Sequence, residues 1–323
     1  MTIWYQITPA DTLFFRGSEP LEAGQPSRDA LFPPPVSVLQ GALRTAVLKQ
    51  RRIAFADYKA NRCASDVIEG IGACSQPAPF RVTAILLARG ETIYVPCPAN
   101  WFVEAGQLAK GGQPSMVGQT ILRAAQPDRA ADSLHLHSSA GTNLPMVRAA
   151  DAQPLAGHWL RLDCLRTPPT EFVEGDLLAP GELYDVEPRT GIAIDSKRKV
   201  KQGAIYSAGH IRLRPEVTMV CGIDRNLGLA EKGFLNLGGE QRVCGYIRCQ
   251  APDLPAMPAA LFVTLAPVEL TNEVLSAVFA AAKPVTLAGW DLANGFHKAT
   301  STWLPAGTVF NHNIDSLCIP LAQ

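Results

Sequence analysis

Short strand-like segments recur along the whole chain, and turns or long loops separate them. Residues 205–211, 216–223 and 243–249 alternate in the way that half-buried strands do, and residues 2–7 give an opening strand. The 26 glycines and 26 prolines among 323 residues supply many turns. The chain is therefore expected to consist of many short strands joined by ordered loops.

Few segments have helical periodicity. A helix is predicted over 38–49, with Leu39, Leu43 and Val47 on its apolar stripe, and the Ser37-x-x-Gln40 pattern is typical of a capping box. A second helix is predicted over 272–282 with Asn272 as its cap, and a short one within 167–179.

Each half of the chain starts with a strand, places helices between strand pairs and ends in a strand. The pairs include a hairpin of 80–87 with 92–96, and 106–157 is an irregular insertion. This order is typical of the βαββαβ unit. It predicts an α+β fold of two ferredoxin-like (RRM-like) domains with long loop and hairpin insertions, at 1–200 and 201–323.

The composition and termini limit the class of protein. No stretch approaches the ~18 uninterrupted apolar residues of a spanning helix, and residues 1–11 lack a signal-peptide pattern. A cytoplasmic protein without a membrane partner is expected. The eight cysteines form no CxxC, so buried free thiols are expected rather than a zinc site.

Positive charge is concentrated in residues 189–214. The whole chain balances 29 basic against 29 acidic residues, yet this segment holds seven Lys or Arg against Asp195 alone. Localised positive charge faces phosphates or an acidic partner, and the alternative is a solvated basic loop. The cations are Arg189, Lys197, Arg198, Lys199, Lys201, Arg212 and Arg214.

Catalytic patterns are weak. There is no GxxxxGK[ST] loop and no GxSxG motif. His135 and His137 have no nearby acid or cysteine to complete a metal set, and His297 lies beside Lys298, which favours phosphate contact. We therefore expect no enzyme, no cofactor and no metal.

Two glycine-rich segments have open interpretations. Gly238-Gly239 forms either a plain turn before the next strand or a turn whose backbone also touches a partner. Residues 287–310 combine glycines, His297-Lys298 and Trp290, which serves either as a core anchor or as a stacking surface for bases.

Several blocks together resemble a known family. They are DTLFFRGSEPL at 11–21, FPPPVSVLQGALRTAV at 32–47, RTGIAIDSKRKVKQGAIYSAGHIRL at 189–213, LGGEQR at 237–242, GWDLANGFHK at 289–298 and LPAGTVF at 304–310. The pattern is similar to the third subunit of the type III-B CRISPR–Cas (Cmr) effector, a RAMP-superfamily protein. The resemblance implies a non-catalytic subunit that holds the 5′ tag of the crRNA in antiviral defence. It also implies contact with the large polymerase-like subunit and a backbone RAMP subunit, and indirect contact with target RNA.

The resemblance, together with the charge pattern, gives a set of candidate RNA-binding residues. They are Arg16, Gly17, Ser37, Gln40, Arg44, Lys197, Arg198, Lys199, Lys201, Arg212, Gly238, Gly239, Arg242, His297 and Lys298. The chain departs from the family where a Pro-Lys run would follow GWDLA. Two alternatives stay open: a RAMP-type endoribonuclease that processes repeat RNA through His135, His137 or His297, and a protein scaffold whose basic segment faces an acidic subunit.

Overall fold

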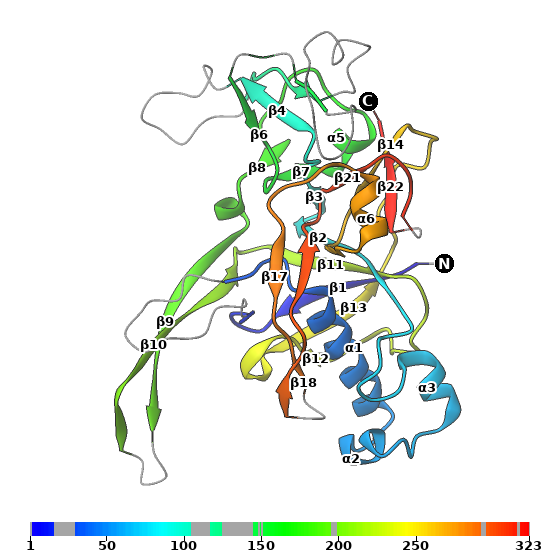
Figure 1. The fold of residues 1–323 in the computed structure, drawn as a ribbon, viewed down its shortest axis with the longest axis vertical. Coiled ribbons are helices and arrows are strands. Elements are labelled where there is room, and N and C mark those ends of the chain that lie inside the picture. The colour runs from blue at the N-terminus through cyan, green and yellow to red at the C-terminus, as the bar shows by residue number, and fades with distance from the viewer. Residues whose placement is uncertain are drawn as a thin grey trace. The chain divides into compact units, whose positions relative to one another are not determined.

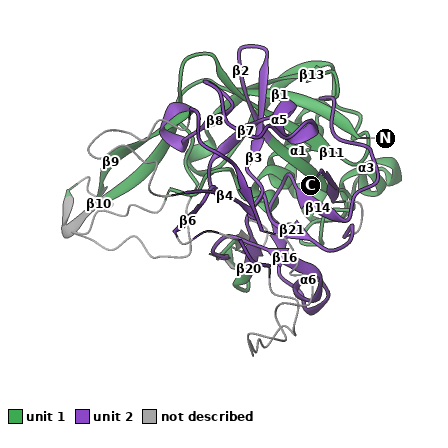
Figure 2. Cartoon of the chain, turned by 90° about the horizontal axis from the view of Figure 1, so that it is seen from above, with its two compact units in different colours: residues 1–85, 183–251, 286–301 green, residues 86–182, 252–285, 302–323 purple. Residues whose placement is uncertain are grey.

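The computed structural model describes residues 2–15, 30–104, 117–124, 145–147, 149, 151–194, 199–291, 295–314 and 317–322, with the backbone alone at 193, 194, 200–206, 290, 291 and 297. These residues form a mixed α/β fold with few helices and several antiparallel sheets (Figure 1). They divide into two compact units, each assembled from three chain segments (Figure 2). Unit 1 comprises Met1–Ile85, Leu183–Ala251 and Thr286–Ser301, and unit 2 comprises Leu86–Glu182, Pro252–Val285 and Thr302–Gln323.

The sheet of unit 1 is built around the first strand. Strand β1 pairs antiparallel with β11 on one side and with β13 on the other, so that Tyr5 lies opposite both Cys221 and Arg248. The spatial order is β12-β13-β1-β11-β2. The bounds are β1 Ile3–Pro9, β2 Val82–Arg89, β11 Val217–Ile223, β12 Lys232–Asn236 and β13 Val243–Cys249.

Helix α1, Val36–Gln50, confirms the long helix predicted near 38–49 and buries Leu39 and Leu43. The predicted capping box is wrong. The helix begins two residues earlier, after Pro35, and Ser37 is exposed inside its first turn with no side-chain cap at the N-terminus. The physical reason is the proline run: extended Pro35 leads directly into the helix. Two short helices follow, α2 Phe55–Lys59 and α3 Ser65–Ile71.

A long hairpin leaves the sheet of unit 1. Its strands are β9 Tyr184–Ile194 and β10 Val200–Leu213, which pair antiparallel with Tyr184 opposite Leu213 and Ala208 opposite Arg189 (Figure 1). Strand β10 contains the strand predicted over 205–211. The remaining elements of unit 1 are the 3₁₀ turn η3 Gly239–Gln241 and the short pair β18 Trp290–Asp291 and β19 Phe296–His297.

Unit 2 consists of small antiparallel sheets. The predicted hairpin of β2 with β3 is present, with Leu87 opposite Tyr94, and β3 continues to β7 and β8. Other strands form the groups β5-β4-β6 and β16-β21-β14-β22, and β15 pairs with β20. The bounds are β3 Thr92–Pro96, β4 Trp101–Glu104, β5 Leu122–Arg123, β6 Ala152–Pro154, β7 Trp159–Arg161, β8 Leu177–Leu178, β14 Leu261–Thr264, β15 Val268–Glu269, β16 Val278–Ala280, β17 Val285–Leu287, β20 Ser301–Leu304, β21 Val309–Phe310 and β22 Cys318–Leu321. Strands β2, β17 and β20 each contain residues of both units.

The helices of unit 2 are short: α5 Leu162–Arg166, α6 Asn272–Ala277 and the 3₁₀ turn η2 Pro180–Glu182. The helix predicted over 272–282 ends at Ala277, because the next residues form β16 and pair with β21. Its cap is Thr271, whose hydroxyl accepts from the Val274 N–H at 3.2 Å, rather than Asn272. The helix predicted within 167–179 is wrong, because that segment ends in β8, which pairs with β7.

The two predicted ferredoxin-like domains are not confirmed. Unit 1 has the strand order β13-β1-β11-β2 of a βαββαβ unit, but after β11 its chain forms β12 where that unit has a second helix. The domain boundary at residue 200 stays a prediction. Both compact units contain segments from either side of that residue. Among the described residues, no helix combines the length and apolar composition needed to cross a membrane.

Candidate nucleic-acid interface

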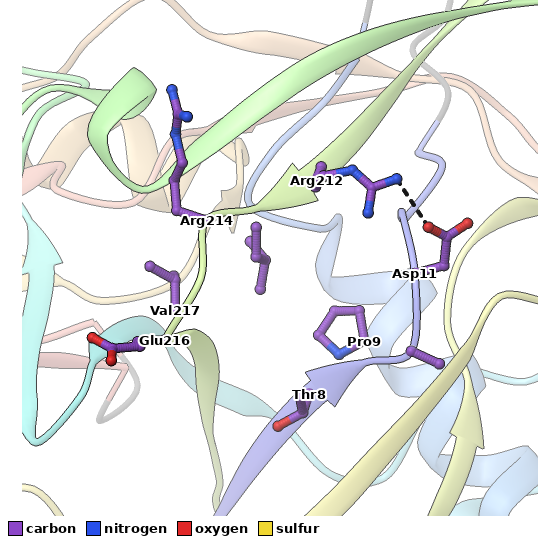
Figure 3. Close-up of a pocket in the computed structure, with 9 residues that line it drawn as sticks. Thr8, Pro9, Asp11, Arg212, Arg214, Glu216 and Val217 are labelled. Carbon is purple, nitrogen blue, oxygen red and sulfur yellow. Dashed lines mark hydrogen bonds and ion pairs between the residues drawn. The ribbon is translucent and has the colours of Figure 1, made fainter.

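Three arginines meet three carboxylates where the hairpin joins the sheet of unit 1. We call Asp11, Glu187, Arg189, Arg212, Glu240 and Arg242 the hairpin-base cluster. The Asp11 carboxylate accepts from Arg212 Nη2 at 3.0 Å (Figure 3). It also accepts from Arg189 Nη2 at 3.3 Å and from Arg242 Nη1 at 3.3 Å. One side chain just after β1 therefore binds arginines from β9, from β10 and from the turn before β13.

Glu187 and Glu240 complete the charge balance of the cluster. Glu187 pairs with Arg212 and lies 3.5 Å from Arg189, and Glu240 pairs with Arg242. Arg214, just beyond β10, pairs with Asp185 at 2.9 Å. The cations at the hairpin base are thus matched by acids, including two of the predicted RNA ligands, Arg212 and Arg242.

The pKa shifts follow this pairing. Desolvation opposes ionisation of Asp11, but the hydrogen bonds from Arg212 and Arg189 outweigh it and lower the pKa of the Asp11 carboxyl. The hydrogen bond from Arg212 lowers the pKa of Glu187, and the bond to Glu187 raises the pKa of Arg212. Each shift favours the charged forms, so the cluster is stabilised as ion pairs at neutral pH.

Buried side chains next to Asp11 in the chain and on β10 pack beside the hairpin-base cluster. His210 is buried, stacks on Phe14 with ring centroids 4.9 Å apart and hydrogen-bonds Thr12 Oγ1 through Nδ1 at 3.2 Å. Desolvation lowers the pKa of His210, which favours the neutral imidazole. The chain after β1 is therefore fixed against β10 by packing as well as by charge.

The Gly238-Gly239 pair packs against this same segment. Gly238 has φ +83°, and a Cβ there would lie 2.5 Å from the Phe14 carbonyl oxygen; at Gly239 it would lie 2.6 Å from the Phe14 ring. The Gly239 N–H donates to the Phe14 carbonyl at 2.8 Å. The Phe14 carbonyl at Gly238 and the Phe14 ring at Gly239 explain both glycines, which lie in a packed turn, as both sequence interpretations predicted.

A cavity of about 220 Å³ lies beside the cluster, between the end of β1 and the connection from β10 to β11 (Figure 3). Its walls carry both signs of charge. The lining residues are Thr8, Pro9, Ala10, Asp11, Arg212, Leu213, Arg214, Glu216 and Val217.

The candidate residues of α1 make internal contacts. Gln40 Nε2 donates to the Phe80 carbonyl at 2.7 Å, and Arg44 Nη2 donates to the Gln76 carbonyl at 3.0 Å. Ser37 is exposed, and a Cβ at Gly41 would meet no atom within 4 Å. Gly41 is thus not needed for helix–sheet packing, and the outer face of α1 is open at this point.

The remaining candidates are only partly described. Arg16, Gly17, Lys197, Arg198, His135 and His137 lie outside the described residues, and for Lys201 and His297 the backbone alone is described, in β10 and β19. Lys199 and Lys298 are exposed, and the Lys298 N–H donates to the Gly289 carbonyl at 2.9 Å. The structure brings Arg212, Arg242, Gly238 and Gly239 together, whereas Gln40 and Arg44 bind a different segment.

Sequence reasoning missed the acids of the hairpin-base cluster. Asp185 and Glu187 stand two residues apart on the strand before the basic segment, so they share one face of β9. That spacing was the available signal for Glu187. Asp11 and Glu240 carry no comparable sequence signal, because tertiary contact alone brings them to the arginines.

No group of three His, Cys, Asp or Glu side chains in the described part of the chain is arranged to hold a metal ion. All eight cysteines are free thiols, and five are buried. Burial raises the pKa of Cys164, Cys221 and Cys244 to about 12. These thiols stay protonated at neutral pH and act as small apolar side chains, as the sequence predicted.

Comparisons with known proteins agree with the resemblance seen in the sequence. A family model described as CRISPR-associated protein (Cas_Cmr3) matches residues 5–263. A chain of the type III-B Cmr-beta complex bound to cognate target RNA has a TM-score of 0.56 at 17% identity, over 96% of this chain and 86% of that chain. A chain of Cmr-beta bound to cognate target RNA and AMPPnP has a TM-score of 0.54 at 15% identity, over 95% and 85%.

No curated protein matches the chain. These two solved structures are similar to this chain in fold, and the similarity covers nearly the whole chain. The family match covers most of the sequence by itself. The chain therefore belongs to the Cas_Cmr3 family, the family of the third subunit of type III-B CRISPR–Cas (Cmr) effector complexes.

Proposed function

We propose that this chain is the non-catalytic RNA-binding subunit of a type III-B CRISPR–Cas complex, in which it holds the 5′ tag of the crRNA. Its family makes it a subunit of a type III CRISPR–Cas complex. The proposed role also includes docking onto the large polymerase-like subunit and contact with a backbone RAMP subunit. Contact with target RNA is indirect, through the complex. Its expected setting is antiviral defence in the cytoplasm.

The observation that carries the RNA-binding role is the division of charge along the hairpin. At its base, Arg189, Arg212 and Arg214 are paired with Asp11, Glu187 and Asp185. The other four cations of the basic segment fall within residues 197–201, where Asp195 is the one acid close in sequence. The net positive charge is therefore assigned to residues 197–201, which comprise the end of the connection between β9 and β10 and the first two residues of β10.

Such a division suits a hairpin that reaches toward a phosphate backbone. Lysines and arginines bind the phosphates of single-stranded RNA without reading its sequence. The paired arginines at the base hold the strands in a fixed direction, so binding does not have to order the whole hairpin. We assign the phosphate contacts to Lys197, Arg198, Lys199 and Lys201.

The salt dependence of tag binding tests this assignment. If roughly four to six phosphates are neutralised, the slope of log K against log salt is about −3 to −4, at ~0.7 per phosphate for single strands. Replacing Lys197, Arg198, Lys199 and Lys201 with Ala should make that slope shallower by up to about 3. Fluorescence anisotropy with labelled tag RNA gives both slopes.

A matched control variant removes four exposed cations elsewhere: Lys59, Arg89, Arg225 and Lys283, each replaced by Ala. Its net charge equals that of the hairpin variant, but its slope should stay within experimental error of the unmodified chain. Equal slopes for all three proteins would sink the assignment of the RNA contacts to the hairpin.

The non-catalytic part of the proposal has its own test. Purified protein is incubated with labelled repeat RNA in the absence of metal. The RNA should stay intact. Cleavage that disappears on replacing His297 with Ala would instead establish the endoribonuclease alternative.

A further inference from the structure

Three apolar side chains are exposed together at one end of the sheet of unit 1. Phe234 on β12 is 76% exposed, and Val243 and Ile247 on β13 are 47% and 49% exposed. Contiguous apolar surface of this kind marks an interaction site more often than an isolated exposed residue does.

The strand register puts all three on one face. Lys232, Phe234 and Asn236 lie opposite Ile247, Gly245 and Val243, and cross-strand partners point to the same side of a sheet. The alternate residues Leu235 and Cys244 are buried on the opposite face. Gly245, opposite Phe234, leaves no side chain between Val243 and Ile247.

Among the strands that the structure describes, none follows at this end of the sheet, so its backbone edge is open there. β12 is the terminal strand, and β13 is its neighbour (Figure 1). The Glu231 carbonyl accepts from the Arg248 N–H at 2.7 Å, and the Leu237 N–H donates to the Arg242 carbonyl at 2.8 Å. Because backbone groups alternate in direction, those of Lys232, Phe234 and Asn236 point away from β13. An additional strand would satisfy them.

The charges beside this edge favour an acidic occupant. Glu231 is paired with Arg248 and Glu240 with Arg242, so these acids are already balanced. Lys232 on β12 and Lys49 on α1, which contacts β12, have no carboxylate partner among the residues that the structure describes; Lys49 donates to the Asn236 amide. Two cations at an apolar edge complement a segment that carries both acidic and apolar side chains.

We propose that β12 receives an extended segment of a neighbouring protein subunit as an additional antiparallel or parallel strand. That segment carries an apolar side chain against Phe234 and Ile247 and an acidic side chain beside Lys232. Of the three apolar side chains, Phe234 alone is aromatic, whereas Val243 and Ile247 are aliphatic, so this surface, beside a backbone edge that can pair, fits a protein strand better than a run of stacked RNA bases. This proposal rests on the proposed function and specifies how the chain docks onto a neighbouring subunit.

Hydrogen exchange at β12 tests the proposal. The full chain is compared with the complex obtained by producing it together with the other subunits of its type III-B complex. Amides of Lys232, Phe234 and Asn236 should exchange rapidly in the free chain and become protected in the complex. Tag RNA alone, added to the free chain, should leave them unprotected.

A pair of substitutions supplies the second measurement. Phe234→Gln combined with Ile247→Gln removes the apolar contact without changing the charge, and should weaken incorporation into the complex roughly tenfold or more, while tag RNA binding keeps its affinity and salt slope. Met257→Gln is the control: Met257 is 79% exposed in unit 2, and this variant should incorporate normally. Circular dichroism of both variants confirms that they are folded.

The outcomes separate this inference from the proposed function. Normal assembly without protection of β12, or unimpaired incorporation of the double variant, overturns the inference alone. Protection by RNA alone assigns the face to nucleic acid, and protection that grows with concentration of the free chain assigns it to a second copy; both overturn the inference. A chain that joins no complex overturns the docking proposal as well.

Discussion

At the scale of single residues, Asp11 organises the hairpin base. It lies in a loop just after β1, yet its carboxylate binds three arginines that come from positions 189, 212 and 242. Salt bridges on a surface contribute little individually, but a shared acceptor couples the elements that carry the donors. The residue therefore fixes the direction of the hairpin more than it adds to overall stability.

Asp11→Asn should destabilise the protein by about 0.5–1 kcal/mol at pH 7, a modest amount because the side chain is 46% exposed. Asp11 and Glu187 have lowered pKa values in the folded state, so their stabilisation is complete above the ordinary carboxyl range and is lost as pH falls through the folded values. Urea unfolding from pH 7 to pH 3 should show the difference between the two proteins shrinking with acidity. A constant difference would contradict the ion-pair account.

Gly238→Ala tests the packed turn. Its φ of +83° and the Phe14 carbonyl 2.5 Å from an added Cβ make the substitution strained, at a cost of about 1–3 kcal/mol. Gly41→Ala is the matched control: it lies in an open stretch of α1, where the same change should stabilise the protein by about 0.5–1 kcal/mol. Thermal unfolding measures both, and equal effects would show that the backbone at Gly238 is not strained.

At the scale of elements, local patterns predicted several strands of the main sheet well and helix ends poorly. β13 has the predicted bounds, and the β2–β3 hairpin was expected from its two strand-like segments and the turn between them. Alternation depends on neighbouring side chains, so it is visible in sequence. The end of α6 depends on β16 pairing with β21, a contact between residues about thirty apart, and no local pattern contains it.

The cap of α6 offers a test at this scale. Thr271→Ala should destabilise the protein by about 1 kcal/mol, because the Val274 N–H loses its hydroxyl acceptor. Asn272→Ala changes the cap that the sequence predicted and should have little effect. Comparable losses of stability in chemical denaturation would mean that the helix begins one residue later than described.

At the scale of the whole molecule, both compact units are interleaved in sequence. Unit 1 takes its sheet from the first 85 residues and from Leu183–Ala251, so its strands come from opposite sides of residue 200. The order of elements suggested two consecutive domains, because sequence order shows which elements exist and not which strands become neighbours. The candidate site could be predicted only in part for the same reason. The basic segment is evident in the sequence, but its pairing with Asp11 depends on tertiary contacts.

Cutting the chain at the predicted boundary tests this interleaving. Residues 201–323 contain β11 and β13 without β1, the strand that both pair with. Produced alone, this fragment should lack cooperative unfolding and the dispersed amide resonances of a folded domain. A cooperatively folded fragment would support the consecutive domains at 1–200 and 201–323 instead.

The central position of β1 also has a consequence for synthesis on the ribosome. β1 leaves the exit tunnel more than 200 residues before its neighbours β11 and β13, which span Val217–Ile223 and Val243–Cys249. At about 5–20 residues per second, the strand remains without its partners for on the order of ten to fifty seconds. Nascent chains of this protein should therefore need a chaperone to cover β1 until translation has passed β13.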